Sequence, residues 1–86
     1  MSKLDKAKER IASRPRDYTY TELRVLLQQL GFEESSKGRT SGSRVKFYRE
    51  RDKRAILLHK PHPGDIIDPG ALRMLVNTLR ELGELV

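Results

Sequence analysis

The sequence contains no cysteine and no long hydrophobic run. Without cysteine, disulfides cannot stabilise its 86 residues, and the composition suits a reducing cytoplasm, where we expect the protein to act. No apolar run approaches the ~20 residues that a transmembrane helix needs, and the basic start at Met1–Lys3 lacks the apolar segment of a signal peptide. We therefore expect one small domain whose core comes from the 36% of hydrophobic residues, and no membrane partner.

Common catalytic motifs are also missing. The chain has no cysteine nucleophile, no G-x-S-x-G elbow and no phosphate-binding P-loop. Its two histidines, His59 and His62, have H-x-x-H spacing with Asp65 nearby, a combination that could form a metal site. However, Pro61 and Pro63 favour an extended segment, unlike the helical or zinc-finger arrangements of metal ligands. The sequence predicts no metal site and no cofactor.

Positive charge is concentrated in the middle third of the chain. Residues 37–60 hold nine lysines and arginines against two acidic residues, a balance of +7. Residues 1–36 carry seven basic and six acidic residues, and residues 61–86 carry two and four. Such concentration is typical of proteins that bind a polyanion, and nucleic acid is favoured over membrane because no amphipathic basic helix or lipidation motif is present. A solvated basic edge that only aids solubility is the alternative.

Three helices are expected. Residues 3–12 have a narrow apolar stripe and precede Pro15, so this helix should pack at the periphery or be partly frayed. Residues 20–30 follow a capping box formed by Thr19 and Glu22, carry leucines at helical spacing and end at Gly31. Residues 69–82 follow Asp68 as N-cap and have a continuous apolar stripe.

Three strands are expected between the last two helices, over residues 32–36, 44–49 and 55–59. In the second, Val45 and Phe47 alternate with Arg44, Lys46 and Tyr48. The predicted fold is α+β: a three-stranded antiparallel sheet with two core helices on one face, plus a short N-terminal helix. The face with Arg44, Lys46 and Tyr48 is then free for a ligand, and Tyr48 can stack on an unpaired base.

The two histidines have two interpretations. Histidine changes its charge near neutral pH and can act as general acid or base when RNA is cleaved through its own 2′-hydroxyl. Alternatively, both shape the loop after the third strand or touch phosphate. Between them, His62 is favoured as the base because Pro61 and Pro63 stiffen its loop.

Four stretches together resemble the HicA family of small mRNA interferase toxins. They are "YTELRVLLQQLGF", "TSGSRVKF", "HKPHPGDI" and "DPGALRMLV", within residues 18–83. The resemblance implies a double-stranded-RNA-binding-domain-like fold over residues 17–86, an N-terminal helical extension at residues 1–16, and a HicB-like antitoxin as partner. The family pattern follows Gly-Ser with a catalytic histidine, whereas Arg44 follows Gly42-Ser43 here. Arginine stays protonated and cannot act as a base, but it binds phosphate and stabilises negative charge.

Three functions remain open at this point. The first is an mRNA-cleaving, metal-independent toxin that uses His62 or His59. The second is an RNA-binding module that does not cleave, and the third is an interaction protein whose basic face docks an acidic antitoxin. Candidate RNA-binding residues are Lys37, Arg39, Ser43, Arg44, Lys46, Tyr48 and Lys60.

Overall fold

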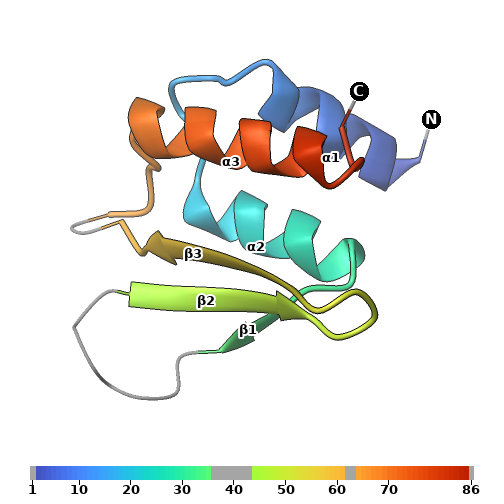
Figure 1. The fold of residues 1–86 in the computed structure, drawn as a ribbon. Coiled ribbons are helices and arrows are strands. Elements are labelled where there is room, and N and C mark those ends of the chain that lie inside the picture. The colour runs from blue at the N-terminus through green and yellow to red at the C-terminus, as the bar shows by residue number, and fades with distance from the viewer. Residues whose placement is uncertain (1, 36–43, 62–63, 86) are drawn as a thin grey trace.

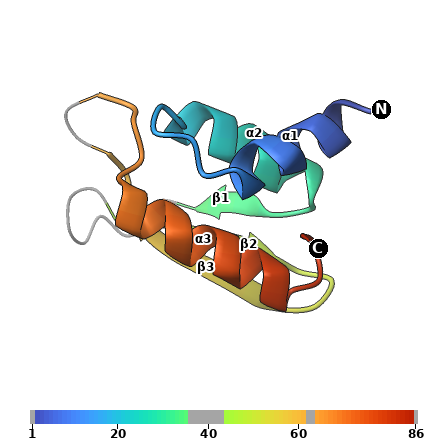
Figure 2. The same cartoon turned by 90° about the horizontal axis from the view of Figure 1, so that it is seen from above.

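The computed structural model describes residues 2–35, 44–61 and 64–85. Helices and strands follow one another in the order α1 (Lys3–Ala12), α2 (Tyr20–Gln29), β1 (Glu33–Ser35), β2 (Arg44–Arg49), β3 (Arg54–His59) and α3 (Pro69–Glu81). The helices lie on one side of the sheet, and Figure 1 shows the opposite side free of helices; Figure 2, seen from above, shows the helices in front of the sheet. The predicted α+β fold is confirmed.

Helix α2 has well-defined ends. The Thr19 hydroxyl accepts from the backbone N–H of Glu22 at 3.1 Å, and the Glu22 carboxylate reaches back to the Thr19 N–H, which completes the capping box. At the other end Gly31 has φ of 97°, and the N–H of Phe32 donates to the Leu27 carbonyl at 2.8 Å. This is a Schellman motif, and it turns the chain from the helix into the sheet.

The sheet has the order β1-β2-β3, and both neighbouring pairs are antiparallel. Burial alternates along β2, where Val45, Phe47 and Arg49 are buried while Arg44 and Lys46 are exposed. Strand β1 begins at Glu33 rather than at the predicted residue 32, because Phe32 belongs to the helix end and is buried in the core; residue 36 lies outside the described residues. The alternation divides the sheet into a core face and a free face.

The core lies between the sheet and the helices. Its central side chains are all buried: Leu23, Leu27, Val45, Phe47, Ile56, Leu58, Leu72, Val76 and Leu79. Helix α1 packs against α2 and α3, and Ile11 at its end is fully buried. The narrow apolar stripe of α1 therefore contributes one complete core side chain, with Leu4 and Ala7 packed against the cluster.

Candidate nucleic-acid interface

The free face of the sheet carries the predicted basic side chains of β2. Arg44 and Lys46 are exposed and Tyr48 is half-buried. Because side chains alternate between the two faces of a strand, these three, at every second position, all point away from the core. The Lys46 ammonium lies 5.6 Å from the centroid of the Tyr48 ring, a cation–π contact. A cation beside an aromatic ring is a combination that suits a phosphate next to an unpaired base.

His59 lies directly opposite Arg44. The two residues are partners in the antiparallel register of β2 and β3, and both are exposed. Directly opposite residues in such a pair have Cβ atoms about 4.5–5.5 Å apart on the same face of the sheet. Arg44 and His59 therefore lie side by side at the end of the free face. Arg44 is the residue that follows Gly42-Ser43 in the sequence, and His59 is the last residue of β3.

Lys60, the next residue along the chain, turns toward the helices. Its ammonium lies 5.5 Å from the centroid of the Tyr20 ring at the start of α2. The Tyr20 hydroxyl donates to the Glu34 carboxylate, and burial together with this hydrogen bond raises the pKa of Tyr20 far above its usual value. Lys60 therefore lies beside the sheet end rather than on the free face itself.

The segment that follows Lys60 is anchored to the start of α2. The Asp65 carboxylate accepts from the hydroxyl of Thr21 at 2.7 Å and from its backbone N–H at 3.2 Å. The Asp65 carbonyl accepts from the N–H of Tyr20 at 2.7 Å, and the N–H of Ile67 donates to the Tyr18 carbonyl at 2.9 Å. Asp65 thus has a structural role: it ties the chain before α3 to the first turn of α2.

Four of the predicted site residues lie outside the described residues. They are Lys37, Arg39 and Ser43 in the segment between β1 and β2, and His62 after β3.

Arg49 does not belong to the interface, although it was counted in the basic segment. It is 2% exposed and faces the core side. Its Nε and Nη2 donate to the two carboxylate oxygens of Asp52 at 2.9 and 2.7 Å, and Nη1 donates to Glu84 at 2.8 Å. Arg49 follows Val45 and Phe47 at every second position of β2. This alternation is the sequence signal that identifies its side chain as inward-facing.

The free face also has an apolar part that the sequence reasoning did not single out. Leu57 is 59% exposed and is the register partner of Lys46. It shares the face with Tyr48, on the neighbouring strand. The alternation of β3, in which Ile56 and Leu58 point inward, is the signal that predicts its exposure.

The described part of the chain holds neither a cluster of metal ligands nor a membrane-spanning helix. In residues 2–35, 44–61 and 64–85, no three potential metal ligands of the His, Cys, Asp or Glu type gather at one point. Every helix there is too short or too polar to serve as a membrane span.

A family model described as the HicA toxin of bacterial toxin–antitoxin systems matches residues 20–83. The match covers α2, the sheet and α3, and it leaves out α1. The chain therefore belongs to the HicA toxin family, which makes it the toxin of a toxin–antitoxin pair and implies a cognate antitoxin as its partner. Comparisons with curated proteins and with solved structures found no match.

Proposed function

We propose that this toxin binds mRNA through the free face of its sheet and cleaves it without a metal ion, in the cytoplasm. The observation that carries the proposal is the pairing of Arg44 with His59 across β2 and β3. The resemblance to the family implies a histidine at the position of Arg44, and we propose that here the opposite strand supplies the imidazole instead. We further propose that residues 17–86 form the RNA-binding domain, with residues 1–16 as its extension.

In the proposed reaction the base is His59 rather than His62, which the sequence favoured, because His59 is the register partner of Arg44 and His62 lies outside the described residues. His59 accepts the proton of a 2′-hydroxyl, and the 2′-oxygen attacks the adjacent phosphorus. The 5′-oxygen leaves with a proton from His62 or from water, which yields a 2′,3′-cyclic phosphate and a 5′-hydroxyl. Arg44, fixed in its charge, stabilises the negative charge that builds up on the phosphate oxygens. Lys46 and Lys60 bind neighbouring phosphates, and Tyr48 and Leu57 contact a base.

A non-cleaving RNA-binding module is the second candidate, and the replacement of the family histidine by Arg44 favours it. Both candidates need the same binding surface and differ only in the role of His59. An antitoxin that covers this face would inhibit either activity.

RNA binding is tested by fluorescence anisotropy over a range of salt concentrations. Because each phosphate contact releases counterions, Arg44→Ala and Lys46→Ala should each flatten the slope of log K against log salt by about 0.7 for single-stranded RNA. Arg51→Ala is the matched control, since this exposed arginine lies in the hairpin at the opposite end of the two strands. Affinity that is insensitive to salt, or equal losses in all three variants, would contradict the proposed surface.

A further inference from the structure

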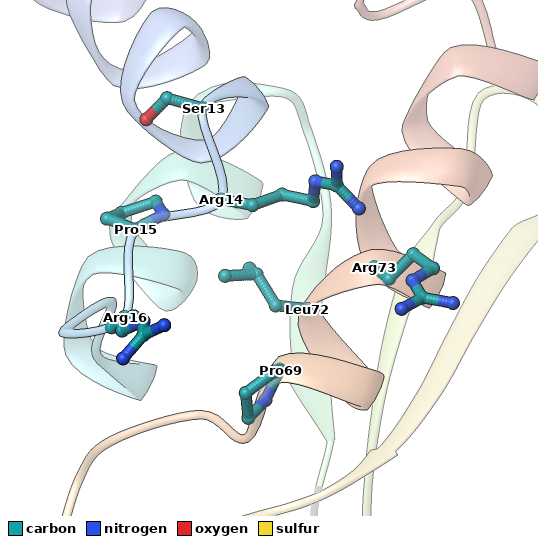
Figure 3. Close-up of a pocket in the computed structure, with 7 residues that line it drawn as sticks. All are labelled: Ser13, Arg14, Pro15, Arg16, Pro69, Leu72 and Arg73. Atoms are coloured by element: carbon teal, nitrogen blue, oxygen red, sulfur yellow. The ribbon is translucent and has the colours of Figure 1, made fainter.

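A second group of arginines, outside the free face of the sheet, surrounds a pocket of about 440 Å³. Arg14 and Arg16 come from the connection between α1 and α2, and Arg73 comes from the first turns of α3. Figure 3 shows Arg14 reaching from the connection toward α3, with the side chain of Leu72 pointing from α3 toward the connection. Ser13, Pro15 and Pro69 complete the lining.

The three guanidinium groups have no carboxylate partner among the described residues. All three arginines are exposed, and none forms an ion pair there. The acidic residues nearest in sequence are engaged elsewhere, because Asp17 accepts from Arg10 at 3.2 Å and Asp68 accepts from the N–H of Ala71 as the N-cap of α3. The pocket therefore has a positive charge that the described part of the protein does not neutralise.

The backbone at Arg14 gives an independent indication of function. Arg14 has φ of 50°, in the left-handed region, one residue beyond the C-cap Ser13 of α1. Helices usually have glycine at this position, because a side chain there crowds the backbone. Strain of this kind commonly persists where a side chain is needed for function. The strained position directs an arginine to the pocket.

The pocket lies at the same end of the molecule as the pair formed by Arg44 and His59. In both views the start of α3, the start of β2 and the end of β3 lie at one end (Figures 1 and 2). The chain from His59 to Pro69 joins the two places directly. A polyanion that contacts the end of the free face can therefore continue around this end of the molecule to the pocket.

We infer that Arg14, Arg16 and Arg73 form a second phosphate-binding subsite, which holds the backbone of the same RNA beyond the nucleotides that contact Arg44. This inference rests on the proposed function. Guanidinium groups suit the ligand because their planar fork binds phosphate oxygens in a bidentate manner. Phosphates recur at regular intervals along the RNA backbone. An RNA that has one phosphate bound at Arg44 therefore has further phosphates that can bind at the pocket.

The test compares the affinity of the full chain for a short and a long labelled single-stranded RNA. Combining Arg14→Gly, Arg16→Ala and Arg73→Ala should flatten the salt slope for the long RNA by at least about 0.7, equivalent to about fivefold weaker binding at about 0.1 M salt. The short RNA, which cannot reach the pocket, should be unaffected. Arg14→Gly alone should weaken binding without lowering the melting temperature, because glycine adopts a positive φ freely.

Arg80→Ala is the matched control, since it removes the same charge from the last turn of the same helix. Unchanged binding in the triple variant, or an equal loss in Arg80→Ala, overturns the subsite and leaves the proposed function intact. Weakened binding of the antitoxin but not of RNA also overturns it, and identifies the pocket as a protein-docking site. If the wild type binds neither RNA with salt-dependent affinity, both the subsite and the proposed function are wrong.

Discussion

Replacement of Arg49 by alanine should destabilise the fold while leaving RNA recognition intact. The Arg49 guanidinium binds Asp52 within the β2–β3 hairpin turn, and it joins this hairpin to both helix ends: to Glu84 beyond α3 and to the Leu30 carbonyl beyond α2 at 3.1 Å. It also lies 4.6 Å from the centroid of the Phe32 ring. Hydrogen bonding with Asp52 and Glu84 raises its pKa, so the group stays charged in its buried position.

The expected magnitude follows from what each partner does when the arginine is removed. Breaking a buried ion pair costs about 3–5 kcal/mol when it leaves an uncompensated buried charge. In this variant the carboxylate of Asp52 can be hydrated, and Glu84 keeps its ion pair with Arg51 at 3.5 Å. The negative charges of both carboxylates are therefore partly stabilised without Arg49. The buried Leu30 carbonyl loses its side-chain donor, which costs about 1–3 kcal/mol. We therefore expect Arg49→Ala to lower the free energy of unfolding by about 2–4 kcal/mol.

The assay is urea denaturation followed by circular dichroism, with Arg51→Ala as the control for loss of an exposed charge. That control should change the free energy of unfolding by less than about 1 kcal/mol, as is usual for surface ion pairs. Equal effects of the two variants would refute the structural role of Arg49. A folded Arg49→Ala protein with a flatter salt slope for RNA would refute its assignment to the core side.

Two further predictions concern stability. Phe47→Ala should lower the free energy of unfolding by about 3–5 kcal/mol, because Phe47 is fully buried, and an effect below about 1 kcal/mol in urea denaturation would contradict the assigned core face. Hydrogen bonding with Arg49 lowers the pKa of Asp52, so its contribution is present above the unfolded pKa of about 4 and is lost as pH falls through the lower folded value. Asp52→Asn should therefore reduce the loss of melting temperature on acidification, and an unchanged acid profile would contradict this linkage.

Local sequence signals predicted most of the fold. The capping box at Thr19 and Glu22, the glycine at position 31 and the alternation around Val45 and Phe47 each act over a few residues, so they can be read from one sequence. Burial of Ile11 was harder to predict, because it depends on how α1 packs against α2 and α3. A narrow apolar stripe does not reveal which partner surface covers it.

The candidate site was predictable only in part. Alternation placed Arg44, Lys46 and Tyr48 on one face, whereas the pairing of Arg44 with His59 depends on the register between two strands. Arg49 was missed because its charge suggested solvent, although its parity indicated the core. The arginine pocket was missed for a different reason: Arg14 and Arg73 are distant in sequence and line one pocket only because the helices pack together.

The most direct test of the central claim is cleavage of mRNA by the purified protein in EDTA, with product ends identified by mass spectrometry. The wild type should produce 2′,3′-cyclic phosphate and 5′-hydroxyl ends, because histidine can move both protons without a metal. His59→Ala should abolish cleavage and keep the salt-dependent affinity for RNA, with His62→Ala tested in parallel. Cleavage by His59→Ala at the wild-type rate would contradict the account. RNA binding without any cleavage by the wild type would instead establish the non-cleaving module.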